Sequence, residues 1–456
     1  MITNETIVAL STPPGAGAIG VIRLSGKEAV RIANEIFHGK DLLKQESHTL
    51  HFGLIKDGDT IIDEVVAGLF LAPRSYTKEN VVELSCHGSG YIIQKIINLL
   101  IRQGATAAKP GEFTLRAFLN GGLDLSQAEA VADLISSDSA AAHQVAMNQL
   151  RGGFSNELNE LRTQLIHFAS MIELELDFAE EDVEFANRGQ LQELISKITS
   201  VLSKLIRSFE LGNVIKEGIS TVIAGRPNAG KSTLLNALLN EDRAIVSEIA
   251  GTTRDTIEEV LNINGINFRL IDTAGIREAT DTIEAIGVEK TMQKISQSAV
   301  LLYLFDVINL SAEEIREDIE RLYRPGMAFL AVANKMDLSY SDRLKELKLP
   351  ETIRFISISA KTQQHINELK ELLYDTAVGG QLSTDQTMVT NIRHLEALQK
   401  TQTALHKVSE GLENPVTSDF LAMDIKQALH YLGEITGQVT TDDLLENIFS
   451  KFCIGK

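Results

Sequence analysis

The spacing of apolar residues changes along the chain and separates stretches of different architecture. Short apolar runs at residues 19–24 and 81–86 predict strands, and the spacing from Gly88 to Arg102 predicts a helix. We therefore expect residues 1–118 to form a mixed α/β domain.

Helical spacing takes over at about residue 119. A first helical face is marked by Val131, Leu134 and Ile135. A second face, with apolar residues three or four apart, comprises Leu158, Leu161, Leu165, Phe168 and Ile172. Helix is expected again from 191 to 209, after an acidic run at 177–184 that breaks or exposes a helix end. The pattern returns near the chain end, after a linker at 379–383, with Leu395, Leu398, Leu405, Leu421, Ile425, Leu429 and Leu432.

Apolar runs typical of buried strands lie between these two helical stretches. The first, at 221–224, leads into Gly225-Arg226-Pro227-Asn228-Ala229-Gly230-Lys231-Ser232 and then into a helix. This strand, glycine-rich loop and helix form the phosphate-binding P-loop pattern. Lys231 can reach the β- and γ-phosphates, and the Ser232 hydroxyl can hold Mg²⁺.

The residues that follow later strands favour guanine over adenine. Asn334-Lys335-Met336-Asp337 comes after the strand at 329–333. The Asp337 carboxylate can accept hydrogen bonds from both N–H groups that guanine presents side by side. Ser359-Ala360-Lys361, after the strand at 355–358, is expected to close over the base.

Two further motifs complete a Ras-like P-loop GTPase domain in the required order. Asp272-Thr273-Ala274-Gly275 supplies an acidic residue for Mg²⁺ and a glycine amide for the γ-phosphate. The segment 251–255 lies before it, and Thr253 is the expected switch I ligand of Mg²⁺. The sequence therefore predicts GTP binding.

The usual water-orienting residue is missing from this domain. Ras-like enzymes place a glutamine after Asp-x-x-Gly, but this chain has Ile276, which can neither donate nor accept a hydrogen bond. Another group must position the water. The nearby polar residues are Arg277, Glu278, Asp281 and Glu284, and composition does not choose among them.

Over its whole length the chain resembles the MnmE (TrmE) family of bacterial tRNA-modification GTPases. The motifs at 225–232, 251–255 and 272–279 carry part of the resemblance, although other GTPases such as Era and EngA share them. The N-terminal segment 12–20 and the C-terminal Cys453-Ile454-Gly455-Lys456 are more specific to the family.

The resemblance implies a K⁺-activated, Mg²⁺-dependent GTPase. Mg²⁺ is expected at Ser232 and Thr253, and Glu284 matches the family's water-orienting glutamate. K⁺ is expected at Asn228, Ser247, Ile249 and Thr252 when two GTPase domains dimerise. The expected GTP-binding residues are Asn228, Ala229, Gly230, Lys231, Ser232, Thr233, Ser247, Glu248, Ile249, Ala250, Gly251, Thr252, Thr253, Asp272, Thr273, Ala274, Gly275, Asn334, Lys335, Asp337, Ser359, Ala360 and Lys361.

The same resemblance implies that residues 1–118 dimerise and bind a tetrahydrofolate derivative, 5-formyl or 5,10-methylene. The expected folate contacts are Arg23, Glu83, Gly122 and Lys456. An arginine suits the glutamate tail, and a carboxylate suits the N–H donors of the pterin. Where many relatives carry a lysine, this chain has Gly122, which removes an ammonium or shifts that contact to another basic residue.

Cys453 has two interpretations. A thiolate is a good nucleophile when its pKa is lowered, and Lys456 is close enough in sequence to help. Alternatively, Cys453 is a small apolar residue packed beside Phe449 and Phe452. The resemblance implies that this cysteine lies near the folate pocket, which suggests the reaction centre without assigning a chemical role, so both interpretations stay open.

The simplest architecture combines α/β domains with an all-α domain. We predict an N-terminal α/β folate-binding-type domain at 1–118 and a helical domain in two parts, 119–215 and 379–456. A Ras-like P-loop GTPase domain at 216–378, opened by Gly212, interrupts the helical domain. A chain of 456 residues is too long for a single core, which agrees with several domains.

Composition narrows the location and the partners. No apolar stretch approaches the ~20 residues that span a bilayer, and the first residues do not predict a signal peptide. The two cysteines, far apart in the sequence, suggest a reducing, cytoplasmic setting. With a net charge of −19, the chain is expected to hold tRNA through a local basic patch or a more basic partner.

The resemblance implies a reaction carried out with the flavin-dependent protein MnmG (GidA) in a heterotetramer-type complex. A one-carbon unit of tetrahydrofolate would become an aminomethyl-type group at C5 of the wobble uridine of certain tRNAs. Two other classes remain open: a ribosome-assembly GTPase of the Era or EngA kind, and a regulatory switch that signals to an effector.

Overall fold

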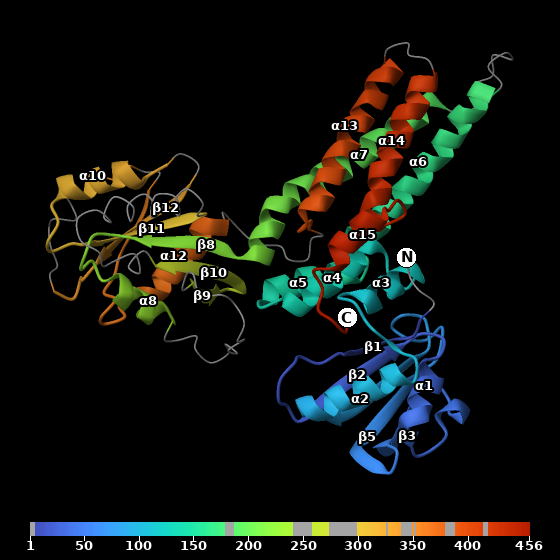
Figure 1. Cartoon of the computed structure of the whole chain (residues 1–456). Coiled ribbons are helices and arrows are strands. Elements are labelled where there is room, and N and C mark those ends of the chain that lie inside the picture. The colour runs from blue at the N-terminus through green and yellow to red at the C-terminus, as the bar shows by residue number, and fades with distance from the viewer. Residues whose placement is uncertain are drawn as a thin grey trace, which may run out of the picture. The chain divides into compact units, whose positions relative to one another are not determined.

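The computed structural model describes residues 5–177, 187–239, 258–272, 299–324, 327–338, 349–350, 353–378, 388–413 and 418–456. The chain divides into two compact units, shown with their elements in Figure 1. The first comprises 1–135, 147–203 and 393–456, and the second comprises 136–146 and 204–392. The division into four domain segments remains a prediction.

A seven-stranded sheet forms the N-terminal part of the first unit. Its strands are β1 (Ile7–Leu10), β2 (Ile19–Ser25), β3 (Phe37–His38), β4 (Thr49–Asp57), β5 (Thr60–Phe70), β6 (Val81–His87) and β7 (Thr106–Ala107). Their order is β3-β4-β5-β6-β2-β1-β7, and all neighbours are antiparallel except β1 and β7. The helices are α1 (Ala29–Ile36) and α2 (Gly90–Arg102), so the predicted strands and helix are confirmed.

The alternation along β2 sends apolar and charged side chains to opposite faces of this sheet. Ile22 and Leu24 are buried in the core that also contains residues of α1 and α2. Arg23 lies between them and therefore projects from the other face. Arg23 is directly opposite Glu83 of β6 in the strand register, which places both predicted folate residues side by side.

From residue 112 onward, the described residues outside the GTPase part form the following helices. They are α3 (Glu112–Leu119), α4 (Leu125–Ser136), α5 (Ala140–Leu150), α6 (Gly153–Asp177), α7 (Arg188–Glu217), α13 (Ile392–Glu413), α14 (Ser418–Thr436) and α15 (Asp442–Phe449). The face of α6 is confirmed, because Leu158, Leu161, Leu165 and Ile172 are buried. α6 packs against α14, which buries Leu421, Ile425 and Leu432 (Figure 1).

Two sequence predictions for the helices were wrong. Ile135 is 48% exposed, and α4 instead buries Leu125, Ala128 and Ala130. Gly212 does not open the GTPase domain, because α7 continues through it to Glu217. A Cβ at Gly212 would lie 2.3 Å from the carbonyl oxygen of Val389, so glycine here serves close approach of two backbones rather than helix termination.

A buried ion cluster joins α4 to α13. Glu129 accepts from Arg393 Nη2 at 2.7 Å and lies 2.7 Å from His394 Nε2. Burial opposes ionisation of Glu129, but the charges of His394 and Arg393 outweigh it and hold the pKa of this carboxyl at about 2.

Replacing Glu129 by glutamine should destabilise the chain by roughly 3 kcal/mol, because it leaves buried cations without their counter-charge. The pKa of Glu129 is depressed, so its contribution is complete above pH 4.5 and is lost as the pH falls toward 2. Urea unfolding at pH 7 measures the free energy of unfolding of Glu129→Gln and of the exposed control Glu396→Gln. Equal stability of Glu129→Gln and the intact chain would contradict it.

The second unit contains a six-stranded sheet. Its strands are β8 (Ile219–Ala224), β9 (Glu258–Ile263), β10 (Ile266–Asp272), β11 (Val300–Asp306), β12 (Ala328–Asn334) and β13 (Arg354–Ser357), with helices α8 (Lys231–Leu239), α10 (Ala312–Leu322) and α12 (Ile366–Val378). The order is β13-β12-β11-β8-β10-β9, and only β9 runs antiparallel to its neighbour. Within the described residues, no helix is long and apolar enough to cross a membrane.

Strand β11 explains why this sheet has helices on both faces. All seven of its residues are buried. Leu302 and Leu304 join a core with residues of α8 and α12, whereas Tyr303 and Phe305 join a second core with residues of α10. The strand order reverses beside β8, and ligands bind such sheets at the carboxyl ends of the strands where this happens.

Candidate functional site

The P-loop leaves β8 at that point and enters α8 at Lys231. Asn228 has φ +61° and Gly230 has φ +100°, both left-handed conformations that turn the loop sharply. A Cβ at Gly225 would lie 2.2 Å from the Leu304 carbonyl oxygen. The predicted glycines at 225 and 230 are therefore required by the local backbone, independently of any ligand.

Lys231 folds over this loop. Its Nζ donates to the carbonyl oxygens of Gly225 at 2.7 Å and Arg226 at 3.2 Å. Ser232 and Thr233 are exposed at the start of α8, where free backbone N–H groups favour an anion. The loop thus presents an ammonium, hydroxyls and backbone donors together.

Asn334 ties the P-loop to the predicted guanine-binding segments. It is buried, its Nδ2 donates to the Ala229 carbonyl at 2.8 Å, and its Oδ1 accepts from the Ala360 N–H at 3.0 Å. A side chain at Gly230 would meet the Asn334 amide at 2.4 Å. The phosphate end and the base end of the site are therefore one hydrogen-bonded assembly.

The base end is held in place by Ser359. Its hydroxyl donates to Asp337 Oδ1 at 2.7 Å and accepts from the Thr362 N–H at 3.2 Å. Asp337 is exposed, so its second carboxylate oxygen can meet a ligand. Lys361 is also exposed beside it.

Two charged residues of this site were missed in the sequence. Asp306 ends β11 and pairs with Lys335 at 2.6 Å. Burial raises the pKa of Asp306, but the hydrogen bonds from Lys335, the Ile308 N–H and Asn309 together outweigh this and lower the pKa overall. Arg226 pairs with Asp318 at 2.7 Å and Glu314 at 2.8 Å on α10. An acidic residue directly after an apolar strand was the available signal for Asp306; no sequence spacing connects Arg226 to α10.

Part of the predicted nucleotide site lies outside the described residues. This holds for Ser247, Glu248, Ile249, Ala250, Gly251, Thr252, Thr253, Thr273, Ala274, Gly275 and Glu284. Asp272 ends β10, with its backbone paired to Ile223 of β8. The structure therefore brings together residues 225–233, 334–337 and 359–361.

A second site forms in the first unit, on the face of the N-terminal sheet that carries Arg23 and Glu83. Arg23 Nε donates to Glu83 Oε1 at 2.8 Å. The guanidinium carbon of Arg23 lies 5.6 Å from the ring centre of Tyr76 and 5.7 Å from that of Phe113. The guanidinium is thus within cation–π distance of both aromatic rings.

The C-terminal tail closes this second site. The Lys456 carbonyl accepts from the Phe113 N–H at 3.2 Å, and the Cys453 carbonyl accepts from the Gly111 N–H at 3.4 Å. The Gly455 carbonyl accepts from Ser11 Oγ at 3.2 Å and from Arg23 at 3.5 Å. Residues 453–456 therefore lie beside Arg23, although more than 400 residues separate them in sequence.

Cys453 itself is exposed. The interpretation that it packs as an apolar residue is wrong, because Phe449 and Phe452 pack on each other, with ring centres 5.2 Å apart, without covering it. The other cysteine, Cys86, is buried, and burial raises the pKa of its thiol to about 11. Of the two thiols, Cys453 is the accessible one.

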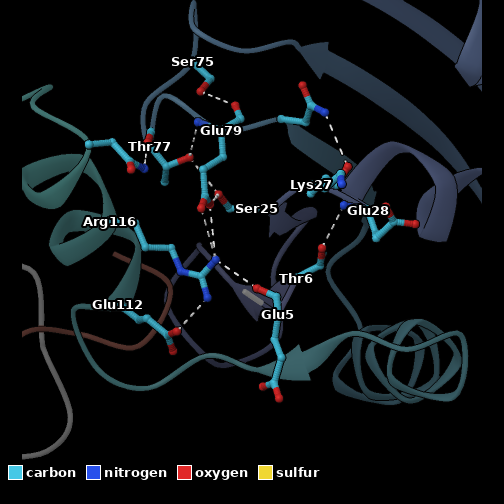
Figure 2. Close-up of polar contacts among 12 residues, drawn as sticks. Glu5, Thr6, Ser25, Lys27, Glu28, Ser75, Thr77, Glu79, Glu112 and Arg116 are labelled. Atoms are coloured by element: carbon cyan, nitrogen blue, oxygen red, sulfur yellow. Dashed lines mark hydrogen bonds and ion pairs between the residues drawn. The ribbon is translucent and has the colours of Figure 1, made fainter. Parts of the chain in front are cut away.

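A buried polar network holds the segment 75–79, which contains Tyr76. Figure 2 shows Arg116 of α3 between Glu79 and Glu112. Arg116 also donates to the Glu5 carbonyl at 2.9 Å, and only 1% of it is exposed. Ser25 of β2 bonds Glu79 at 2.7 Å. Because charged groups this deeply buried are held by several partners, residues 75–79 are fixed against β2 and α3.

Comparison with known proteins agrees with this layout. The family model described as MnmE helical domain matches residues 125–453, and that described as GTP-binding protein TrmE N-terminus matches residues 6–122. The tRNA modification GTPase MnmE of Cytophaga hutchinsonii is 57% identical over 457 residues, covering 100% of this chain and 99% of that protein. That of Christiangramia forsetii is 55% identical over 474 residues, covering 100% of both.

Among solved structures, Era of Aquifex aeolicus bound to GDP·AlF4⁻ is similar to part of the chain. It is 29% identical, covers 41% of this chain and 66% of its own, and has a TM-score of 0.29.

Proposed function

The chain belongs to the MnmE (TrmE) family of tRNA modification GTPases, and from this premise we propose how its two sites divide the work. It is a GTP-hydrolysing enzyme involved in tRNA modification. We propose that hydrolysis is K⁺-activated and drives a conformational step. The modification would use a one-carbon unit of tetrahydrofolate to build an aminomethyl-type group at C5 of the wobble uridine, in cytoplasmic complexes with tRNA.

The residues of the second unit fit GTP and its cations. Ser232 is exposed where it can hold Mg²⁺, with Thr253 as the proposed second ligand. Asn228 is exposed in a left-handed turn beside the phosphate-binding backbone, where its side chain can hold K⁺. Ser247, Ile249 and Thr252 are the other proposed K⁺ ligands. The bound cation supplies positive charge where negative charge develops as the β–γ bond breaks.

The residues of the first unit fit a reduced folate. Tyr76 is 37% exposed, and its ring offers flat apolar surface. Glu83 offers a carboxylate for pterin N–H donors, and Lys456 offers a cation. The observation that carries this proposal is the docking of the Cys453–Lys456 tail beside Arg23. It places the exposed thiol and the proposed folate residues in one unit.

The proposed partners rest on the family resemblance and on the charge of the chain. We propose a homodimer through the N-terminal domain and a complex with the flavoprotein MnmG (GidA). With 43 basic against 62 acidic residues, the chain itself is poorly suited to gripping tRNA phosphates over its whole surface. A more basic partner would deliver the tRNA.

Mass spectrometry of tRNA nucleosides from cells with and without the chain tests this function. Loss of a C5-substituted wobble uridine on deletion, restored by the intact chain, is the expected result. An unchanged nucleoside profile would overturn the uridine proposal and favour a ribosome-assembly role, which cosedimentation with ribosomal subunits would then examine.

The same assay tests Cys453. Cells that carry Cys453→Ser should lose the modified uridine by at least ~10-fold, because a hydroxyl is a far weaker nucleophile than a thiolate. GTP turnover of the purified variant should be unchanged, since Cys453 lies in the other unit from the nucleotide site. Retained modification would instead make Cys453 a structural residue of the tail.

A further inference from the structure

The side chain of Lys78 fills the space beside Gly122. A Cβ atom added to Gly122 would lie 3.4 Å from Cγ and 3.4 Å from Cε of Lys78, which is van der Waals contact along the lysine stem. Residue 122 is where the family resemblance leads us to expect a lysine. The stem of a lysine therefore occupies this place, although the residue at 122 is a glycine.

The backbone at Gly122 does not account for glycine there. Gly121, two residues after the end of α3, has φ +68°, and the Gly122 N–H donates to the Ala117 carbonyl at 2.7 Å, as in a Schellman motif. Gly122 itself is not among the glycines with positive φ. A Cβ there would meet the Ala117 oxygen at 3.0 Å and then the Lys78 stem. Glycine at residue 122 is therefore favoured by these close neighbours, which leave little space for a Cβ, and not by its own φ angle.

Lys78, by contrast, sits in a conformation that suits glycine. Its φ is +61°, which L residues rarely adopt. The turn around it is firmly held, because Asn120 Nδ2 donates to the Thr77 carbonyl at 2.7 Å and Thr77 Oγ1 lies 2.7 Å from Ser25 Oγ. The positive φ of Lys78 is a strained conformation, and the anchored turn maintains it. Such strain is typical of functional sites, which indicates that the Lys78 side chain has a function.

The charges around the site favour another cation besides Lys456. Arg23 is paired with Glu83 and only 16% of its side chain is exposed, so the two charges largely cancel. A folate carries two carboxylates on its glutamate tail, and these bind best to ammonium or guanidinium groups. Lys78 is exposed and makes no ion pair with any residue of the described ranges.

We propose that Lys78 binds the glutamate-tail carboxylates of the folate, in place of a lysine at residue 122. Tyr76, two residues before Lys78 in the same turn, packs on Arg23. The turn therefore supplies both an aromatic wall of the site and a cation at its edge. The proposal rests on the folate site proposed above and names the residue that determines recognition of the tail.

Calorimetric titration of the full-length chain with 5-formyltetrahydrofolate tests it. Lys78→Gly should weaken binding by roughly tenfold, as expected for loss of a charge-assisted pair. The double variant Lys78→Gly/Gly122→Lys, which returns the ammonium to residue 122, should restore most of the affinity. Lys40→Gly, an exposed lysine beside the edge strand β3, should bind as the intact chain does.

Two further measurements separate tail recognition from a structural effect. 5-Formyltetrahydropteroate lacks the glutamate, so Lys78→Gly and the intact chain should bind it equally. Thermal unfolding of Lys78→Gly should occur at the same or a higher temperature, because glycine relieves the positive φ. A structural role would instead lower the unfolding temperature.

The outcomes are distinguishable. If the intact chain binds the folate and Lys78→Gly binds it equally well, Lys78 does not read the tail and the inference fails while the folate site stands. The inference also fails if the variant weakens binding of the tail-less pteroate to the same degree. If the intact chain binds neither compound, the folate proposal fails, and the inference fails with it.

Discussion

Glu284→Ala should lower GTP turnover by about 100-fold or more while leaving GTP affinity unchanged. The chain has Ile276 where Ras-like enzymes have the glutamine that orients the attacking water, so another side chain must do this. Positioned acid–base groups typically contribute 10²–10⁴-fold, which sets the expected loss. Glu284 lies outside the described residues, so this role rests on the family resemblance and on chemistry.

The measurement is single-turnover phosphate release in KCl, with a fluorescent GTP analogue to follow binding separately. Asp281→Ala is the matched control, an acidic residue three positions earlier in the same segment. The control should turn over normally if water orientation belongs to Glu284 alone. Normal turnover of Glu284→Ala, or an equal loss in both variants, would remove Glu284 from this role.

The nucleotide site was predictable from sequence because its residues are contiguous in short motifs. A P-loop needs a strand, a tight loop and a helix in immediate succession, and β8, the loop around Gly230 and α8 supply them in that order. The same holds for Asn334, the last residue of the buried strand β12, and for Ser359, which comes two residues after β13. The residues of each motif are neighbours both in the sequence and in space. Their arrangement can therefore be predicted from the sequence pattern alone.

The second site could be predicted only in part. The resemblance led to Arg23 and Glu83, and strand register places them opposite each other. It did not lead to Tyr76 or Phe113, because the approach of their rings to Arg23 depends on how α3 and the turn after residue 75 pack. Lys78 was hidden for the same reason, since its contact with Gly122 bridges 44 residues of sequence.

The helical errors have a different cause. An apolar spacing identifies a helix but does not say which face is covered. The spacing predicts a face through Ile135, whereas α4 buries Leu125 and Ala128. Gly212 predicts a domain boundary, since glycine often ends helices. Its actual role, close contact with the backbone at Val389, depends on a residue 177 positions away.

GTP turnover in KCl should exceed turnover in NaCl by at least ~10-fold at equal ionic strength. A cation placed where an arginine finger acts stabilises the charge that develops on the phosphates, and such fingers are worth about 10³–10⁵ in rate. K⁺ and Na⁺ carry the same charge but differ in radius, so a site shaped for one holds the other poorly. Bulk screening is identical in the two salts and cannot produce the difference.

Asn228→Gly should abolish the advantage of KCl. Glycine accepts the φ of +61° at this position, so the loop keeps its backbone while the amide side chain that can hold K⁺ is removed. Asn264→Gly is the control, because Asn264 has φ +51° in the β9–β10 turn of the same unit. Turnover of that control should still depend on K⁺. Equal turnover of the intact chain in KCl and NaCl would show that K⁺ does not supply the positive charge. A side chain such as Arg277 would then have to supply it.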